Sequence, residues 1–424
     1  MKKIQKRVLN ILLVLGLGGV IGFILLLLVY LLPVNRIIYN ANASIEQFRE
    51  WGWNPRVIED YEATTIDTYT DAWMMRIAFY DGDESVLQKC MSNYYYGYDD
   101  ERTTNVCESM IAYLEGMEGY KRFSYGRYWH GYLVLLKPLM CFFSYGDIIG
   151  ILKFIQLALA ASCIALLVRK KLTRCIPCMV VLLSCIEFHV IGMSMQFSWV
   201  FMVAMLSSMY LLNKKEEAYF DQSVDLAFLV TGMCTSYLDF LTYPLFTLGI
   251  PLTFMLVQRS MSERKSRVFI TTLLDAFYWA LGYAGMWVIK WILCTVVTGE
   301  NIIADGIYTV MYRTGADVLG DKVGYLEVLE KNIWTMGKYP YALAVVCAAV
   351  FLLGRGKMRF VRASKETVAA YIFVACLPLL WYAVVKQHSY IHYFMTYRNL
   401  GISVFAVLCF LSQIKTPLDN MYQS

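Results

Sequence analysis

Long uninterrupted runs of apolar residues dominate the pattern along this chain of 424 residues. A helix needs about 20 apolar residues to cross a hydrocarbon core of roughly 30 Å. The first run, 9–32, is longer than the apolar stretch of a cleaved signal peptide, which has about 7–15 residues. We therefore expect an uncleaved anchor, although Ala41-Asn42-Ala43 imitates a cleavage site. Further runs lie at 148–168, 175–193, 195–212, 224–240, 242–258, 268–297, 340–354, 367–386 and 398–413.

These runs predict an all-α polytopic membrane protein with about ten transmembrane helices. If the first run begins in the cytoplasm, every second connection between spans is also cytoplasmic. These short segments then contain 20 of the 38 Lys and Arg residues. Those residues lie at 2–7, 169–174, 214–215, 259–267, 355–365 and 415. Because Lys and Arg are enriched in cytoplasmic loops, we predict a multi-pass protein of the plasma membrane with both termini in the cytoplasm.

The runs also divide the chain into five parts. We expect an N-terminal anchor at 1–32, a large outer loop at 33–147 and a transmembrane bundle at 148–298. A second outer loop follows at 299–339, and the C-terminal spans and a short cytoplasmic tail complete the chain at 340–424. Loops longer than about 12–15 residues are uncommon and usually functional, so the first outer loop attracts most interest.

The first outer loop has helical patterns of its own and should lie on the membrane surface. One helix is predicted over 71–80 with Thr70 as its N-cap, and a second over 103–117, whose apolar face should pack on the first helix or on the membrane. The aromatic segment 93–98 between them is typical of a loop. The apolar stretch 132–143 is too short to span, which favours an interfacial or re-entrant helix.

Composition supports the membrane assignment. Hydrophobic residues make up 58% of the chain and charged residues 17%, whereas soluble domains have about 45–50% and about 25%. This excludes an ordinary soluble enzyme, a disordered chain and a nucleic-acid-binding protein. The net charge of +5 is explained by basic residues beside anionic lipid, and between Pro33 and His130 there are 16 carboxylates against nine Lys and Arg.

Most of the 12 cysteines fall in the apolar runs, where Cys behaves as a small apolar residue. Cys175 and Cys178 have the spacing of a redox or metal site, but no second ligand pair accompanies them. Cys90 and Cys107 are the pair within the outer loop. They form either a disulfide or two buried thiols, and the sequence leaves both open.

Three polar clusters on the predicted outer side contain side chains suited to catalysis or binding. In the first, Asp67 and Asp71 lie four residues apart, so they are either a carboxylate pair for general-base work or helix caps. Glu59-Asp60 is a rival pair, and Arg76 is a further candidate.

The second cluster, Arg127-Tyr128-Trp129-His130, fits either an aromatic membrane belt or a phosphate site. The third contains Lys386, His388, His392, Tyr397 and Arg398. A helix would place its two histidines on one face, where a carboxylate would be needed to complete a metal site, and no HExxH pattern is present.

This layout resembles the C-type polytopic glycosyltransferases, which use polyprenyl-phosphate sugars on the outer face of a membrane. The resemblance implies inverting transfer to an acceptor hydroxyl, with Asp71 as general base and Asp67 as its partner. It implies that Arg127, His130, His388, His392 and Arg398 bind the donor phosphate. A glycan or lipid would be the acceptor, no cofactor would be required, and a divalent metal would be optional. The acidic pair departs from the usual pattern because three residues separate it.

Two other classes remain open. A transporter or flippase for a lipid-linked glycan would need polar residues through the depth of the membrane. The in-membrane charges are few, mainly Lys153 and Asp275, and no inverted repeat of broken helices is visible. A non-enzymatic scaffold or sensor would use the outer loop as a binding module.

Overall fold

The structure is a computed structural model that describes residues 2–98, 105–262, 267–318, 320–338 and 364–413. Within these ranges, six helical segments are long and apolar enough to cross a membrane. They are α1 (Lys2–Val29), α8 (Tyr145–Arg169), α11 (Met195–Leu212), α14 (Val268–Thr298), α18 (Lys365–Val384) and the segment Tyr393–Ser412, which contains α20 (Tyr393–Thr396), η3 (Tyr397–Asn399) and α21 (Leu400–Ser412). A mostly helical fold with helices of membrane-spanning length is therefore confirmed, and the number of about ten spans stays a prediction.

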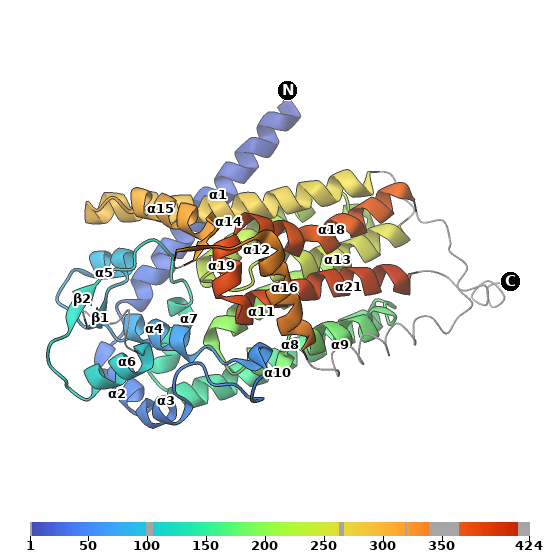
Figure 1. Ribbon diagram of the computed structural model, residues 1–424. Helices are drawn as coiled ribbons and strands as arrows, with labels where there is room; N and C mark the ends of the chain where they lie inside the picture. Colours follow the sequence, from blue (N-terminus) through green and yellow to red (C-terminus); the bar gives the residue numbers. More distant parts are fainter. Residues whose placement is uncertain (1, 99–104, 263–266, 319, 339–363, 414–424) are drawn as a thin grey trace.

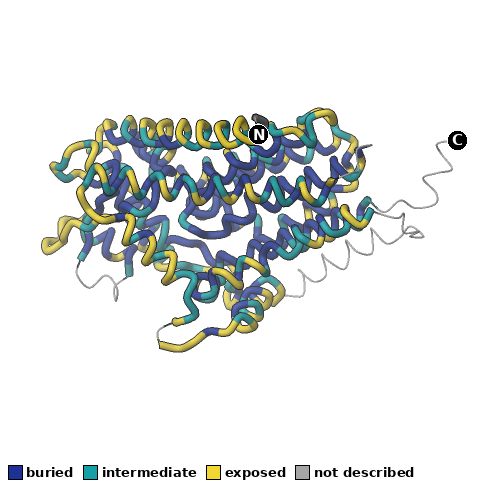
Figure 2. Tube along the Cα trace, turned by 90° about the horizontal axis from the view of Figure 1, so that it is seen from above, coloured by how far each residue is buried: buried dark blue, intermediate teal, exposed yellow. Residues whose placement is uncertain are grey.

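Shorter helices occupy three further predicted spans. They are α9 (Cys175–Cys185), which α10 (Phe188–Ile191) follows, α12 (Gln222–Leu238) and α13 (Phe246–Met261). The predicted span at 340–354 lies outside the described residues. Together the helices form an elongated bundle (Figure 1), in which buried residues fill the interior and exposed ones follow the outside (Figure 2).

Helices α12 and α14 approach each other closely at two glycines. A Cβ atom on Gly232 would lie 2.0 Å from the Trp279 carbonyl oxygen, and one on Gly282 would lie 2.0 Å from the Leu229 carbonyl oxygen. Small residues allow this backbone approach between membrane helices. The contact therefore requires glycine on both helices.

The 33–147 segment folds at one end of the bundle (Figure 1). Its helices are α2 (Val34–Asn42), α3 (Ile45–Trp51), η1 (Glu62–Thr64), α4 (Thr68–Ala78), α5 (Val86–Ser92), α6 (Val106–Leu114) and α7 (Leu133–Met140). Helix α6 packs against α4, as predicted, and α7 is the expected short helix. Cys90 and Cys107 are buried free thiols.

Two predictions for this segment were wrong. Helix α4 begins at Thr68, and its N-cap is Asp67, whose carboxylate accepts the Thr70 N–H at 3.0 Å. Thr70 is therefore already inside the helix. The aromatic segment 93–98 is not only a loop, because β1 (Tyr95–Gly97) pairs antiparallel with β2 (Lys121–Phe123).

Two buried lysines hold the C-termini of helices in this segment, where carbonyl groups lack partners, and one of them, Lys290, comes from the bundle. The Lys137 ammonium of α7 donates to the Ala78 carbonyl at the end of α4, at 2.6 Å. The Lys290 ammonium of α14 donates to the Met91 carbonyl at 2.8 Å and to Asn93 Oδ1 at 3.0 Å, at the end of α5.

A second polar region lies at the same end of the bundle. It comprises α15 (Ile302–Thr314), the antiparallel pair β3 (Asp317–Val318) and β4 (Asp321–Lys322), α16 (Tyr325–Gly337) and α19 (Lys386–Ile391). A short helix η2 (Glu216–Ala218) lies at the opposite end, between α11 and α12. Helix α19 contacts both α15 and α16. Helices α16 and α20 also contact η1, so residues from the last third of the chain meet the 33–147 segment here.

Candidate functional site

Asp71 lies at the N-terminus of α11, although it belongs to α4. Its carboxylate is fully buried and accepts the Met195 N–H at 2.9 Å, the Gln196 N–H at 3.1 Å and the Tyr145 hydroxyl at 2.8 Å. The first N–H groups of a helix lack internal partners and favour an anion. Both Asp71 oxygens are therefore occupied by donors from other elements.

Asp67 has spare hydrogen-bonding capacity. Its Oδ2 atom is buried and has no hydrogen-bond partner in the part of the chain that the structure describes. Burial raises the pKa of Asp67 to about 6, against the hydrogen bond from Thr70 and the charge of Arg398, which lower it. Burial and the negative charge of Asp67 raise the pKa of Asp71 to about 7. We call Asp67 and Asp71 the acidic group.

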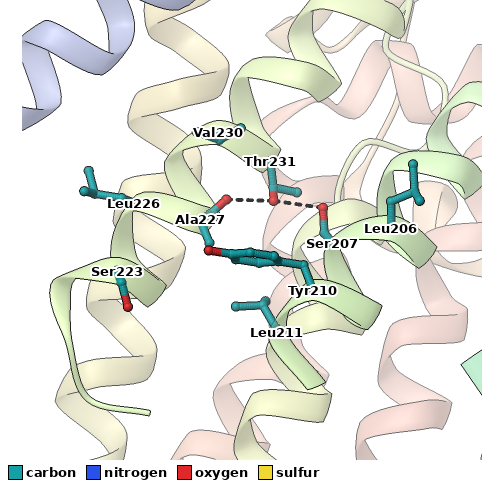
Figure 3. Close-up of a pocket in the computed structure, with 9 residues that line it drawn as sticks. All are labelled: Leu206, Ser207, Tyr210, Leu211, Ser223, Leu226, Ala227, Val230 and Thr231. Atoms are coloured by element: carbon teal, nitrogen blue, oxygen red, sulfur yellow. Dashed lines mark hydrogen bonds between the residues drawn. The ribbon is translucent and has the colours of Figure 1, made fainter. Parts of the chain in front are cut away.

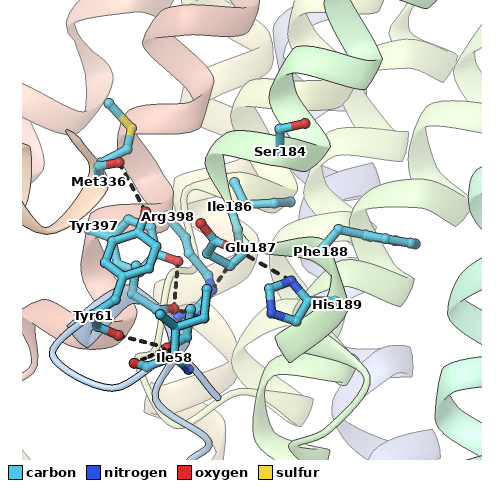
Figure 4. Close-up of polar contacts among 12 residues, drawn as sticks. Ile58, Tyr61, Ser184, Ile186, Glu187, Phe188, His189, Met336, Tyr397 and Arg398 are labelled. Carbon is cyan, nitrogen blue, oxygen red and sulfur yellow. Dashed lines mark hydrogen bonds and ion pairs between the residues drawn. The ribbon is translucent and has the colours of Figure 1, made fainter. Parts of the chain in front are cut away.

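Arg398 is buried beside the acidic group. Its guanidinium donates to the carbonyl oxygens of Ile186 at 3.1 Å, Phe394 at 2.9 Å and Ala63 at 3.3 Å. The side chain is directed toward the turn at Ile186 (Figure 4) and lies 4.2 Å from the Phe197 ring. Arg398 thus joins η3 to the 33–147 segment through neutral acceptors.

A second set of residues, the basic group, contains Arg127, Arg313, His388 and His392. The Arg313 Nη1 atom lies 3.1 Å from His388 Nδ1 and 3.0 Å from His392 Nε2. Since a guanidinium only donates, both ring nitrogens are acceptors. His388 Nε2 then donates to the Leu241 carbonyl at 2.6 Å.

His388 lies in α19 and His392 is the C-cap of that helix, so the two rings lie on one face, as predicted, with centroids 4.6 Å apart. Burial and the charge of Arg313 lower the pKa of His392 to about 3. Burial, with the charges of His392 and Arg313, also places the pKa of His388 well below its ordinary value. Arg313 forms hydrogen bonds with the histidine nitrogens that a metal ion would need as ligands. Among the described residues, no three His, Cys, Asp or Glu side chains lie close enough together to hold a metal ion.

Arg127 supplies the second guanidinium of the basic group. It forms an ion pair with the partly exposed Asp305 at 3.2 Å and lies 5.7 Å from the Tyr128 ring. Tyr128 lies near both arginines of the basic group, because the charge of Arg313 also acts on its hydroxyl. The Trp287 ring lies 5.9 Å from the Tyr128 ring.

Several buried donors around Tyr128 are unused. Within the described ranges, Arg127 Nε, Arg313 Nε, Trp287 Nε1 and Tyr283 Oη have no hydrogen-bond partner. Buried polar groups normally find partners. A region with two guanidinium groups and unused buried donors, in which Arg127 is paired only with the partly exposed Asp305 among the described residues, suits an anion.

His130 connects Tyr125 and Tyr132 through its buried ring. Its Nδ1 lies 3.1 Å from the Tyr132 hydroxyl, and its Nε2 lies 2.8 Å from the Tyr125 carbonyl. Burial and the charge of Lys290 place the pKa of His130 well below its ordinary value. A neutral His130 adds no positive charge for a phosphate.

The acidic and basic groups are connected through one turn of the chain. Gln196 donates its N–H to Asp71 and its Nε2 to Asp239 Oδ1 at 3.4 Å. Asp239 accepts the Leu241 N–H at 3.1 Å, and the Leu241 carbonyl accepts from His388. A continuous network of hydrogen bonds therefore runs from the 33–147 segment to α19.

The remaining predicted residues have separate places. Arg76 Nε donates to the Tyr96 carbonyl at 2.9 Å, and its guanidinium lies 5.1 Å from the Trp73 ring and 4.9 Å from the Tyr95 ring. Glu59 and Asp60 are exposed, and Lys386 is half-buried at the start of α19. The Tyr397 hydroxyl donates to the Ala63 carbonyl at 3.0 Å, beside Arg398.

Sequence reasoning did not select Arg313, Gln196 or Asp239 as site residues. Arg313 lies two helical turns after Asp305 in a helix with many exposed apolar residues, a pattern that would have marked one polar face. Gln196 offers no such signal, because its role depends on Asp71, 125 residues earlier. Searches against protein-family models, curated proteins and solved structures find no match for this chain.

Proposed function

We propose that this protein is a membrane glycosyltransferase that transfers a sugar from a polyprenyl-phosphate donor to an acceptor hydroxyl on the outer face of the plasma membrane, in the assembly or modification of cell-envelope glycans. The observation that carries the proposal is the basic group. Arg127 is paired with the partly exposed Asp305, Arg313 forms no ion pair with any residue that the structure describes, and both retain a buried, unused Nε donor. Arginine is well suited to phosphate because its planar fork of donors matches the phosphate oxygens.

In this proposal the donor phosphate binds to Arg127 and Arg313. Their charge stabilises the phosphate as it leaves, in the manner of preorganised donors aimed at developing charge. No cofactor is then required, and a divalent metal is optional. The neutral His388 and His392 orient Arg313 by accepting its hydrogen bonds.

A carboxylate of the acidic group would accept the proton of the acceptor hydroxyl, which belongs to a glycan or a lipid. Asp67 is better suited than Asp71, because Asp67 Oδ2 has no partner among the described residues and both Asp71 oxygens are occupied. A pKa of about 6 also suits a general base near neutral pH. Asp71 would then fix the position of α4 against α11.

The proposal includes a topology of about ten spans with both termini in the cytoplasm. The 33–147 segment would lie on the outer membrane surface, with the basic group at the boundary. Support comes from the alternation of basic residues along the sequence and from the position of this segment at one end of the bundle.

The test is reconstitution in liposomes with a radiolabelled polyprenyl-phosphate hexose and candidate acceptors. We expect product from the wild type, and a loss of at least about 100-fold in turnover for Asp67→Asn, a common effect of removing a general base. Arg313→Gln should raise the KM for the donor. Asp83→Asn and Arg36→Gln, which change exposed residues of the same segment, are the matched controls. Full turnover in Asp67→Asn would refute the base assignment.

A second candidate is a flippase for a lipid-linked glycan. It is favoured by a buried ion pair at the opposite end of the bundle, where Arg259 Nη1 lies 2.5 Å from Asp275 Oδ2. The same liposomes separate the two functions, since a flippase would move the donor between leaflets without forming product. A scaffold or sensor would do neither, and its function would survive the Asp67 and Arg313 substitutions.

A further inference from the structure

A cavity of about 450 Å³ lies at the end of the bundle opposite the 33–147 segment. It is formed by the beginnings of α1, α12 and α14, with Phe220 from the turn before α12. Arg7, Arg267, Asp225 and Thr271 give it a polar part, and Phe220, Ile270 and Leu274 an apolar part. Its size is within the usual range of ligand pockets, about 300–1,000 Å³.

The charges around this cavity are predominantly positive. Neither Arg7 nor Arg267 forms an ion pair with any residue that the structure describes. Asp225, only 4% exposed, is the single carboxylate among the described residues that line the cavity. The nearby Asp275 is already paired with Arg259, which does not line the cavity.

Two other nearby charged residues, Asp221 and Arg259, do not line the cavity. The exposed Asp221 is the further carboxylate that acts on Asp225, so it offsets one of the two cavity arginines at most. The Arg259 Nη2 donor is fully buried and has no partner within the described ranges. The cavity itself is therefore lined by two guanidinium groups, Arg7 and Arg267, and one carboxylate, Asp225.

The start of α14 adds donors of its own. Arg267 is the N-cap of this helix of 31 residues, and no side chain caps the free N–H groups of the first turn. Ile270 and Thr271 of that turn line the cavity. Free N–H groups at a helix N-terminus bind phosphate readily.

We propose that this cavity binds the phosphate of an anionic phospholipid, with Arg7 and Arg267 as its main ligands. The hydroxyl groups of a glycerol-type headgroup would donate to Asp225, and the lipid backbone would lie along Phe220, Ile270 and Leu274. Basic pockets between transmembrane helices commonly bind anionic headgroups. The site is separate from the proposed transferase site and does not depend on it.

A second hollow of the same bundle offers a contrast. It has about 490 Å³ and lies between α11 and α12 (Figure 3). Its wall is mostly apolar, and Thr231 already bonds to Ser207 at 2.9 Å and to the Ala227 carbonyl at 2.8 Å. No charged side chain lines it, so it has none of the features that select a phosphate.

The test is native mass spectrometry of the full-length protein titrated with phosphatidylglycerol, phosphatidylcholine or inorganic phosphate. We expect preferential binding of phosphatidylglycerol and a loss of at least about tenfold in affinity for the double variant Arg7→Gln/Arg267→Gln, because charge-assisted hydrogen bonds are removed. The control Lys170→Gln/Lys171→Gln removes the same charge at the same end, away from the cavity. We expect less than about a twofold change there.

Three results would overturn the proposal: equal losses in both double variants, equal affinity for phosphatidylcholine, or full displacement of the lipid by inorganic phosphate. A measurement on the wild type covers the case in which the double variant does not fold. Photoactivatable phosphatidylglycerol should crosslink to the first turns of α14, near 267–274. Crosslinks confined to other helices would refute the site.

Discussion

Replacing Asp71 tests whether this residue stabilises the fold or performs chemistry. Asp71→Ala removes the acceptor of the Met195 N–H, the Gln196 N–H and the Tyr145 hydroxyl. A hydrogen bond to a charged group contributes about 1.5–3 kcal/mol, and the loss of a helix cap alone costs about 0.5–2 kcal/mol.

The three bonds together give a gross loss of about 5–9 kcal/mol. The variant also removes the cost of burying a carboxylate, which is several kcal/mol. We therefore expect a net destabilisation of about 2–4 kcal/mol for Asp71→Ala. Asp71→Asn retains one acceptor oxygen, so it should lose about half as much.

The assay is thermal unfolding in detergent, followed by tryptophan fluorescence, with proteolysis of the 33–147 segment as a second measurement. Asp83→Ala is the matched control, since Asp83 is an exposed carboxylate of the same segment. It should change stability by less than about 0.5 kcal/mol. If Asp71→Ala unfolds at the wild-type temperature but abolishes turnover, the capping role is wrong and Asp71 is the base.

Three further predictions use the same preparations. The midpoint of thermal unfolding should fall as pH rises from about 4 to 7, because the raised pKa values of Asp67 and Asp71 mean that the folded state keeps protons that the unfolded chain releases; a profile as steep in Asp67→Asn as in the wild type would contradict this. Lys290→Met should expose α5 to proteases, since two hydrogen bonds at its C-terminus are lost; unchanged cleavage would refute the link. Gly232→Ala should destabilise the bundle by about 1–3 kcal/mol through overpacking, whereas Gly150→Ala, which has open space, should be neutral.

The membrane helices could be predicted from the sequence because each depends on a local property. A run of about 20 apolar residues is a sufficient signal by itself, and the short helix α7 was predicted from an apolar stretch too short to span. Helix α4 was predicted one turn late because Asp67 and Thr70 are both good N-caps. Only the side-chain bond from Asp67 to the Thr70 N–H identifies the first residue.

The candidate site could be predicted only in part, because its contacts join distant parts of the chain. The sequence indicated that His388 and His392 share a helix face, which is a local property. It could not indicate that the Arg313 guanidinium donates hydrogen bonds to both histidine rings, because Arg313 lies 75 residues before His388. Nor could it indicate that Asp71 caps α11, 124 residues away at Met195.

The polar residues of this end of the bundle differ in how much of their hydrogen-bonding capacity the fold already uses. Asp71 is committed to the start of α11, Lys137 to the end of α4 and Lys290 to the end of α5. A charge with all its partners inside the protein stabilises the fold, and a ligand would have to displace those partners. Arg127, Arg313 and Asp67 keep buried atoms that no described residue satisfies. Unused capacity of this kind is expected to have a purpose, so these three residues are where a substrate can gain binding energy without breaking the structure that holds the site.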